Sequence, residues 1–432
     1  MRYRDPVLCL INPPHPYLVD PKAQAPLGLL YIAAAVRERG FEIKFVDLSD
    51  RHYSEMAQID FPKADIYGIT GTVLDRRSVH AVAAMVKMQH AEAAVVVGGP
   101  ITLSRDMLDW MMIDSFVMGE GEETIFNVLE DWPHIKREYY GQRITDLDSL
   151  PLPARDLLGE SLGGNVFAHR KSKFGDESTV ISTSRGCPSA CTFCASVNLW
   201  KRKIIYRSPE SVAAEIRYVV DTYGVKQFRF SDDNVTASRA RLFKLCDALR
   251  GMDIAWRASI RVKPNDPEVF TEMKAAGCFE VCFGTESADP DVLNALGKRI
   301  KPEDSERAMM NAKRAGLVVR ILTMVGTPGM TERTVDLEMD FLTRNRENYD
   351  SVALTNFAPL PGTKVYDYPE ACGCEILDHD IDHYNLCFYG PDGEANTWVN
   401  LVRPVAMTLE RLTEDKSRLR KFVEDIGKVN RG

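Results

Sequence analysis

Short apolar segments alternate with amphipathic helical segments along most of this chain, in two successive series. Each apolar segment has the length of a strand, and the next segment repeats its apolar residues at helical spacing, as Val79, Val82, Ala83 and Val86 do. Strands that alternate with helices form parallel sheets covered on both faces. We therefore expect an α/β protein.

The first series predicts an N-terminal doubly wound parallel sheet. Its clearest helices are expected at residues 27–39 and 77–89, and Gly40 stands where glycine commonly ends a helix. Sheets of this kind bind ligands beyond the carboxyl ends of their strands, where the strand order reverses. The strands are expected at residues 7–11, 41–46, 66–70, 94–97 and 115–118.

The second series predicts an open partial barrel of six strand–helix units, three-quarters of a full eight-stranded barrel. Ser208 and Pro209 indicate the start of one helix, and Gly224 indicates its end. Catalytic residues of barrels lie at the carboxyl ends of the strands. The strands are expected at residues 179–183, 227–230, 254–259, 279–285, 318–325 and 351–357.

These two series set the expected domain organisation. Prolines between Leu150 and Arg155 prevent regular pairing and stiffen the connection between the series. The C-terminal region is expected to be short, mostly helical and to end in a charged helix at 409–424. The domains are expected at 1–140 (doubly wound), 141–175 (linker), 176–364 (partial barrel) and 365–432 (C-terminal region).

Composition indicates a globular enzyme of the cytoplasm. The hydrophobic share of 45% and the charged share of 27% are ordinary, and a net charge of −8 without a basic block argues against nucleic acid as a partner. Ten cysteines at uneven spacing do not resemble a secreted disulfide framework. No apolar run reaches the roughly 18 residues of a membrane span, and the N-terminal run is too short for a signal peptide.

Three cysteines, Cys187, Cys191 and Cys194, follow the first expected barrel strand within eight residues. No fourth cysteine or histidine is close in sequence, whereas a structural zinc site uses four ligands. A cubane iron–sulfur cluster held by only three thiolates leaves one iron free to bind a substrate or cofactor. Zinc and three buried structural cysteines are the alternatives.

This Cys-x3-Cys-x2-Cys spacing, with Phe193 inside it, resembles the signature of the radical S-adenosylmethionine (SAM) enzymes. The resemblance implies a [4Fe–4S] cluster on the three cysteines, whose open iron binds SAM. It also implies reductive cleavage of SAM to methionine and a 5′-deoxyadenosyl radical. An electron donor such as flavodoxin or ferredoxin is then needed, in a reducing compartment.

Polar residues at the expected strand ends match the positions that the family uses for SAM. The turn Asp232–Asn234 could accept hydrogen bonds from the SAM ammonium, or it could be an Asx turn. Arg261 could hold the SAM carboxylate, or it could form a surface salt bridge. Glu286 suits the ribose hydroxyls, and glycine at 326 would let the backbone approach adenine. The expected SAM residues are Phe193, Asp232, Asp233, Asn234, Arg261, Glu286, Ser287 and Gly326.

Glycines follow several strands of the first series, where a large flat ligand could lie on exposed backbone. Ahead of a Leu-Pro-x-Pro linker and a radical SAM barrel, this pattern resembles the cobalamin-binding domain of cobalamin-dependent radical SAM enzymes. We expect this edge to face the barrel mouth, because a methyl donor must reach the substrate. The expected cobalamin residues are Asn12, Thr70, Gly71, Thr72, Gly98, Gly99, Pro100, Glu120 and Gly121.

A histidine ligand to cobalt is not expected. Many cobalamin domains carry Asp-x-His-x-x-Gly in the first loop, but here that loop has only His15, without the aspartate or the glycine. Asp50-x-His52 is a near match in the wrong loop. The lower face of cobalt is then expected to be water-bound, empty or met by another side chain.

The remaining cysteines support weaker expectations. Residues 1–150 hold only Cys9, which argues against the tRNA methylthiotransferases, because their N-terminal domain carries three more cluster cysteines. Three cysteines after the barrel lie near two histidines, and a second metal site there stays open. They are Cys372, Cys374 and Cys387, with His379 and His383. Core positions are expected for Cys246, Cys278 and Cys282.

Together these features predict a cobalamin-dependent radical SAM methylase of an unactivated carbon on a small molecule. The cofactors carry the hard chemistry and the protein positions them. The same radical could instead lead to cyclisation, oxidation or rearrangement, as in the anaerobic porphyrin cyclase of the family. A third class is a cobalamin carrier or sensor, and the complete cysteine signature speaks against it.

Overall fold

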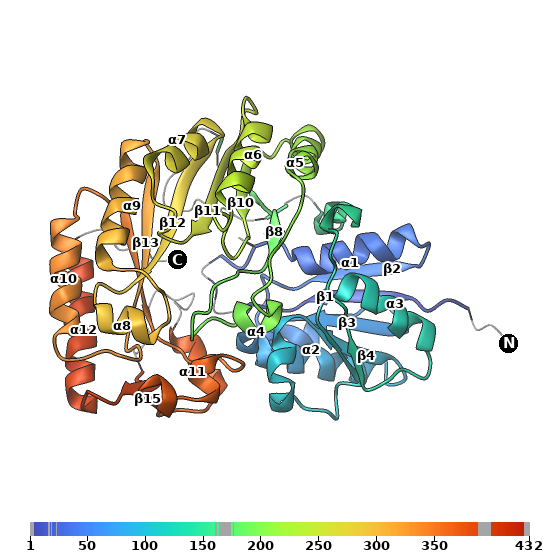
Figure 1. Ribbon diagram of the computed structural model, residues 1–432. Coiled ribbons are helices and arrows are strands. Elements are labelled where there is room, and N and C mark those ends of the chain that lie inside the picture. Colours follow the sequence, from blue (N-terminus) through green and yellow to red (C-terminus); the bar gives the residue numbers. More distant parts are fainter. Residues whose placement is uncertain are drawn as a thin grey trace. The chain divides into compact units, whose positions relative to one another are not determined.

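The computed structural model divides into two compact units, Met1–Gly164 and Asn165–Gly432 (Figure 1), and each is described by itself. No helix of the described part is long and apolar enough to span a bilayer. The structure describes residues 4–15, 18, 20–22, 24–159, 162–163, 174–175, 177–387 and 399–426.

The first unit is built on a six-stranded parallel sheet with the order β2-β1-β3-β4-β5-β6. Leu8 and Leu10 pack into one core layer while Cys9 and Ile11 pack into the other, so β1 is buried on both faces. The strand order reverses between β1 and β3, where such sheets bind ligands. The strands are β1 Leu8–Asn12, β2 Ile43–Asp47, β3 Ile66–Thr70, β4 Ala94–Gly98, β5 Ser115–Met118 and β6 Glu138–Tyr140.

Helices cover both faces of this sheet. α1 and α3 lie on one face, where Leu29 and Phe126 join the same core layer, and α2 lies on the other through Val79 and Val86. The proline-rich segment docks onto α1, since Ala154 N donates to Leu30 O at 3.1 Å. The helices are α1 Leu27–Glu38, α2 Arg76–Gln89 and α3 Gly121–Asp131, with 3₁₀ turns at Tyr53–Gln58, Val73–Asp75, Pro100–Met107, Leu147–Ser149 and Arg155–Leu158.

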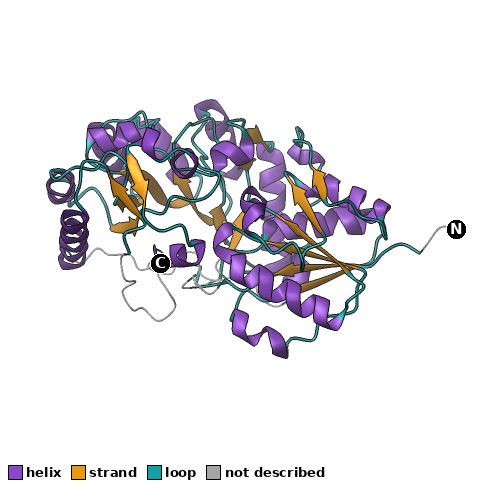
Figure 2. Cartoon of the chain, turned by 90° about the horizontal axis from the view of Figure 1, so that it is seen from below, coloured by secondary structure: helices purple, strands orange, loops and turns teal. Residues whose placement is uncertain are grey.

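The second unit contains a six-stranded parallel sheet with the order β14-β13-β12-β11-β10-β7, which is the expected partial barrel. Figure 2 shows its strands in orange, with helices in purple beside them. Along β11 the residues Trp256 and Ala258 are buried, whereas Arg257 and Ser259 on the opposite face are partly exposed. The strands are β7 Thr179–Ile181, β10 Gln227–Phe230, β11 Ala255–Ile260, β12 Cys278–Glu286, β13 Val318–Val325 and β14 Ser351–Asn356.

Residues that predict the ends of a helix in the sequence stand at the ends of that helix in the structure. Ser208 caps α5 by accepting a hydrogen bond from Ser211 N at 3.1 Å, and Gly224 ends it in the left-handed conformation. The helices are α4 Ser196–Trp200, α5 Pro209–Tyr223, α6 Arg239–Leu249, α7 Pro267–Ala275, α8 Pro290–Ala295, α9 Pro302–Arg314, α10 Thr334–Arg344, α11 Lys364–Asp367 and α12 Leu409–Asp425.

Among the described residues, the second unit also contains two small antiparallel pairs and two 3₁₀ turns. One pair lies beside the cysteine run and the other lies in the C-terminal region. The pairs are β8 Ser184–Arg185 with β9 Ile205–Tyr206, and β15 Cys374–Ile376 with β16 Val402–Pro404, and the turns are Glu370–Cys372 and Ile381–Cys387.

Candidate active site

The cysteine run forms a loop after β8, and its three thiols line one cavity of about 170 Å³. Gly186 starts the loop with φ +98°, and a Cβ at this position would lie 2.1 Å from Lys203 O. Only glycine fits there. Cys191 is buried, while Cys187 and Cys194 are partly exposed toward the cavity. The structure thus brings together the three residues predicted to hold the cluster.

Backbone hydrogen bonds fix the loop to the barrel. Thr192 N donates to Leu296 O at 3.0 Å, and the Thr192 hydroxyl donates to Ala295 O at 3.1 Å. On the other side, Val365 N donates to Thr192 O at 3.1 Å. The loop is therefore held between the end of α8 and the start of α11.

The chemistry of this donor set fits an iron–sulfur cluster. Three thiols spaced around a cavity suit a cluster, because each thiolate then binds a different iron atom. Burial raises the pKa of Cys194 to about 11. Iron binding must therefore displace the proton of that thiol.

Arg261 lines the same cavity. The alternative of a surface salt bridge therefore does not describe its position. Its Nη1 is 3.2 Å from the Sγ of Cys191, and its Nη2 donates to Lys298 O. Its guanidinium offers donors to an anionic group inside the cavity.

Glu286 stands at the end of β12 and also lines the cavity. Its backbone is left-handed, with φ +62°, and its Oε1 lies 2.8 Å from the Nζ of Lys298. Both side chains are nearly buried, at 11% and 5% exposed. Gly284 makes room for this carboxylate, because a Cβ there would lie 2.5 Å from Oε1. Nothing in the sequence pattern singled out Lys298, which follows α8 in the segment Gly297-Lys298-Arg299.

The turn Asp232–Asn234 separates into three different environments. Asp233 lines the cavity and accepts a hydrogen bond from Gly186 N at 3.1 Å. Asp232 is buried and accepts from Thr183 N at 2.8 Å, from the Thr183 hydroxyl at 2.7 Å and from the Ser184 hydroxyl. Asn234 accepts from Thr236 N and from its hydroxyl, which makes an Asx turn. Only Asp233 of the three is a cavity residue.

Two further residues expected at SAM lie outside the cavity lining. Ser287 is buried, and its hydroxyl donates to Glu338 and accepts from Asp289 N. Gly326 has φ +81°, and a Cβ there would lie 2.8 Å from Cε of Lys416 in α12. By contrast, Phe193 lines the cavity as expected.

Cys282, expected to pack in the core, is a fourth cysteine in the cavity wall. Its sulfur accepts from Nη2 of Arg257 at 3.1 Å and lies 3.4 Å from Oε1 of Glu280. Burial raises the pKa of this thiol. Side chains alternate between the two faces of a strand, so Cys282 and Glu286 of β12 lie on the same face. This alternation could have identified Cys282 as a cavity residue.

In the first unit, the expected cobalamin residues gather at the carboxyl edge of the sheet. Thr70 and Gly98 are register partners at the ends of β3 and β4, and Ile101 N donates to Gly71 O at 2.8 Å. A Cβ at Gly98 would make only ordinary contacts, the nearest at 3.6 Å from Val117 O. The other members of the set lie at the ends of β1, β3, β4 and β5 or at the start of the elements that follow them, and they are Asn12, Thr72, Gly99, Pro100, Glu120 and Gly121.

Glu120 has internal partners that could account for it without a ligand. The carboxylate is buried, its Oε2 accepts from Ile144 N at 2.6 Å, and its Oε1 lies 3.2 Å from Nη1 of Arg143. Gly121 packs closely on α1, since a Cβ there would lie 2.8 Å from Cδ1 of Ile32.

His15 is held by side chains of the same edge. Its Nδ1 lies 2.7 Å from Oδ1 of Asp75, and its Nε2 lies 3.2 Å from Oδ1 of Asn12. The second carboxylate oxygen of Asp75 accepts from Thr72 N and from its hydroxyl. Both ring nitrogens of His15 therefore have a partner within the protein.

The cysteines of the C-terminal region face backbone carbonyls. The thiol of Cys372 donates to Lys364 O at 3.8 Å and that of Cys374 donates to Pro369 O at 3.5 Å. The side chain of Cys387 lies outside the described residues, so a second metal site there remains only an expectation. His383 lies 2.7 Å from Asp378 Oδ2 through its Nδ1.

Comparisons with known proteins match the chain to two family models and to curated relatives. The family model of the radical SAM superfamily matches residues 181–342, and that of the B12 binding domain matches residues 22–129. An uncharacterized methyltransferase of Pyrococcus horikoshii is 32% identical over 369 residues, which are 79% of this chain and 78% of the relative. An anaerobic magnesium-protoporphyrin IX monomethyl ester cyclase of Synechocystis sp. is 26% identical over 326 residues, 70% of this chain and 65% of the relative.

A solved structure shows the same fold. The radical S-adenosylmethionine methyltransferase TsrM from Kitasatospora setae, with cobalamin and a [4Fe–4S] cluster bound, has a TM-score of 0.69 at 16% identity, over 99% of this chain and 93% of its own. A radical SAM domain implies a [4Fe–4S] cluster and SAM, and a B12 binding domain implies cobalamin. The chain belongs to the cobalamin-dependent radical SAM enzymes.

Proposed function

We propose that the chain is a methyltransferase that transfers a methyl group to an unactivated carbon of a small molecule. The observation that carries this proposal is the relative from Pyrococcus horikoshii, which is named a methyltransferase and is 32% identical across 79% of this chain. The cavity geometry supports the radical part of the chemistry, because thiols, a guanidinium and carboxylates line one cavity.

In this proposal Cys187, Cys191 and Cys194 hold the cluster. When bound, the cluster and SAM supply a carbon-centred radical, and cobalamin supplies the methyl group. Arg261 lies beside Cys191 and would pair with the SAM carboxylate as a fork of two N–H donors. Asp233 would accept from the SAM ammonium.

Glu286 would accept from the ribose hydroxyls. Its ion pair with Lys298 and its fixed backbone hold the carboxylate in place before SAM arrives. A preformed acceptor binds more tightly because less side-chain freedom is lost on binding.

A second candidate is a radical cyclase, which the 26% identity with the porphyrin ester cyclase favours. The two reactions differ in the fate of the methyl group of SAM. A methyltransferase places that group in the product and forms S-adenosylhomocysteine, whereas a cyclase adds no carbon.

The test uses anaerobically reconstituted protein with reductant, cobalamin, a cellular extract and SAM that carries a deuterated methyl group. We expect deoxyadenosine, S-adenosylhomocysteine and a labelled product, detected by mass spectrometry. Omitting cobalamin should remove the label. Deoxyadenosine with an unlabelled, cyclised product would replace the methyltransferase proposal with the cyclase.

A further inference from the structure

The inner face of the partial barrel carries a buried group of arginines next to the cavity of the three thiols, which we call the inner cavity. Side chains alternate along a strand, so Arg257 lies on the same face of β11 as Ser259, which lines the inner cavity. Because two residues of a strand span about 6.6 Å, Arg257 lies one layer of side chains closer to the amino ends of the strands.

The register of the sheet brings two more arginines and one glutamate to this level. Arg229 of β10 and Glu280 of β12 are the register partners of Arg257. Arg320 of β13 pairs with Cys282, which stands two residues after Glu280 on the same face. Nη2 of Arg257 lies 3.4 Å from Oε1 of Glu280 and 3.1 Å from Sγ of Cys282. We call this group the arginine layer, and its members are Arg229, Arg257, Arg320 and Glu280.

The arginine layer holds an excess of positive charge. Three guanidinium groups and one carboxylate, that of Glu280, give the layer a formal net charge of +2. The neighbouring thiol of Cys282 does not compensate for this excess, because burial raises the pKa of the thiol. Burial and the charge of Arg257 lower the pKa of Arg229 to about 10, so Arg229 is still protonated at neutral pH.

Burial distinguishes these arginines from the cations of the surface. Arg217 on α5 is exposed, and water solvates its charge, whereas Arg320 is only 9% exposed. Removing a charge from water is costly, so buried charges in proteins are normally compensated by a group of opposite charge. Guanidinium groups bind carboxylate and phosphate oxygens through forks of N–H donors. An oxyanion therefore has the chemistry that the arginine layer requires.

We propose that the arginine layer binds a doubly charged oxyanion, the phosphate group of a small-molecule substrate. The proposal rests on the proposed function, because it assigns the anion to the molecule that is methylated. A phosphate group carries a charge of about −1.5 to −2 at pH 7, which matches the excess charge of the layer. With its phosphate held there, the substrate extends into the adjoining inner cavity, where the radical forms. No bond forms or breaks at the arginine layer itself.

Calorimetric titration with inorganic phosphate tests the site directly. The protein carries its reconstituted cluster and bound SAM, without reductant, so that the SAM site is already occupied. We expect saturable binding to the wild type, and at least about 10-fold weaker binding to Arg229→Met and to Arg320→Met, because each change removes charged donors. Acetate, which has a single charge, should bind at least about 10-fold more weakly than phosphate.

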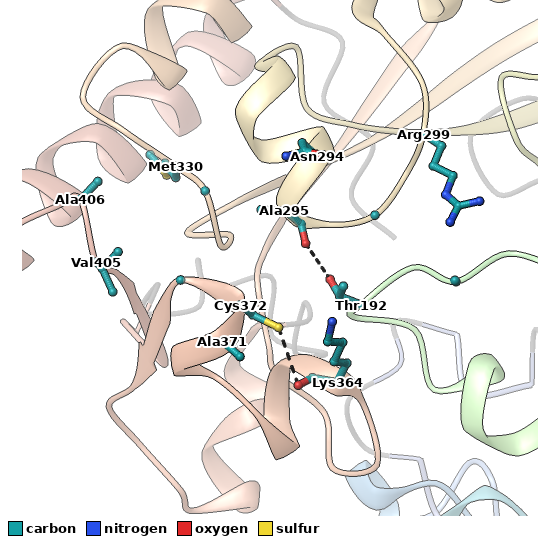
Figure 3. Close-up of a pocket in the computed structure, with 14 residues that line it drawn as sticks. Thr192, Asn294, Ala295, Arg299, Met330, Lys364, Ala371, Cys372, Val405 and Ala406 are labelled. Carbon is teal, nitrogen blue, oxygen red and sulfur yellow. Dashed lines mark hydrogen bonds between the residues drawn. The ribbon is translucent and has the colours of Figure 1, made fainter.

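The matched control lies in a second, outer cavity of this unit, which has a volume of about 660 Å³. Arg299 and Lys364 line this cavity (Figure 3), and both are exposed. The variant that combines Arg299→Met with Lys364→Met removes two positive charges from solvent-exposed positions. This control should keep the wild-type affinity for phosphate.

Urea unfolding separates a binding role from a structural one. Replacing part of a buried excess of charge with an apolar side chain is neutral or stabilising. Arg229→Met, which keeps the ion pair of Arg257 with Glu280, should therefore be at least as stable as the wild type in buffer without phosphate. Added phosphate should stabilise the wild type but not the variant.

Phosphate that does not bind the wild type, or that binds both arginine-layer variants equally well, would overturn the proposal. A loss of binding confined to the outer-cavity control would also overturn it, and so would reduced stability of the arginine-layer variants with unchanged phosphate affinity. Acetate bound as tightly as phosphate would overturn the assignment of a doubly charged group.

The labelled-methyl assay distinguishes this proposal from the proposed function. Inorganic phosphate should reduce the yield of labelled product in the wild type without changing the affinity for SAM, and an unchanged yield at saturating phosphate would contradict the substrate assignment. Wild-type protein that forms no labelled product at all would instead contradict the proposed function, whereas the phosphate titration would still decide whether the arginine layer binds an oxyanion.

Discussion

At the scale of residues, Asp232 and Asp233 show how neighbours in sequence acquire different surroundings. Asp232 is buried and accepts hydrogen bonds from Thr183 and Ser184, whereas Asp233 lines the cavity. The sequence predicts that both follow a barrel strand, but it cannot say which one faces the cavity. That direction depends on how the turn after Phe230 packs against β7 and the loop.

We predict that Asp232→Asn destabilises the fold while Asp233→Asn does not. An amide at position 232 would face donors with its NH₂ group, which leaves a buried donor without an acceptor and costs about 1–3 kcal/mol. In Asp233→Asn the amide oxygen can still accept from Gly186 N. Urea unfolding should show the difference, and a weaker affinity for SAM should appear only in Asp233→Asn. Equal losses of stability in the two variants would contradict this division.

Lys298 is one residue of the site that the sequence did not reveal. Lys298→Gln removes the partner of a nearly buried Glu286 carboxylate, so we expect weaker SAM binding with the cluster absorption unchanged. A charge-assisted contact contributes about 1.5–3 kcal/mol, or about 10- to 150-fold in affinity. Glu286→Ala should fall in the same range. Lys244→Gln, an exposed change, is the control, and equilibrium dialysis with SAM is the measurement. Unchanged affinity in Glu286→Ala would remove the ribose assignment.

At the scale of elements, the cysteine loop depends on one glycine. Gly186→Ala would place a Cβ 2.1 Å from Lys203 O, so the loop must move and the cluster should be lost. Gly224→Ala imposes a similar left-handed strain of about 1–2 kcal/mol at an open position, where nothing lies within 4 Å. Iron content and cluster absorption should fall only in Gly186→Ala. A full cluster in that variant would show that the loop tolerates the shift.

Strong local signals predicted most of the elements. The apolar run Val318–Val325 is β13 as predicted, and Ser208 with Gly224 bounds α5. β6 was missed, because Glu138–Tyr140 is a three-residue edge strand without an apolar pattern. The Glu286–Lys298 pair was missed for another reason: a helix separates the two residues, and only the packed fold joins them.

At the scale of the whole molecule, two α/β units each carry their candidate site at the carboxyl ends of parallel strands. The sequence predicted both sheets, and the family matches on residues 22–129 and 181–342 identify them as cobalamin and SAM modules. The role of each single residue in binding cobalamin remains a prediction. The features that mark this sheet edge, such as glycine turns, are common to many sheets of this kind.

The first unit should bind about one equivalent of cobalamin without a histidine ligand. A Cβ at Gly98 would make only ordinary contacts, so we expect Gly98→Val to keep the fold. Its side chain would stand at the sheet edge where cobalamin is expected, and the affinity should fall about 10-fold or more, which is about 1.4 kcal/mol. Gly28→Val on α1 is the control. His15→Ala should leave the corrin spectrum unchanged, since the ring already contacts Asp75 and Asn12. A shifted spectrum in that variant would identify His15 as a ligand.

Cys187, Cys191 and Cys194 are predicted to hold the cluster that cleaves SAM. The most direct test measures the deoxyadenosine that reconstituted protein releases from SAM under dithionite. It compares the wild type with the variant in which all three cysteines are changed to alanine. We predict deoxyadenosine from the wild type and none from the variant, which should also lack the cluster absorption. Release of deoxyadenosine by the triple variant would show that these cysteines do not hold the cluster that cleaves SAM.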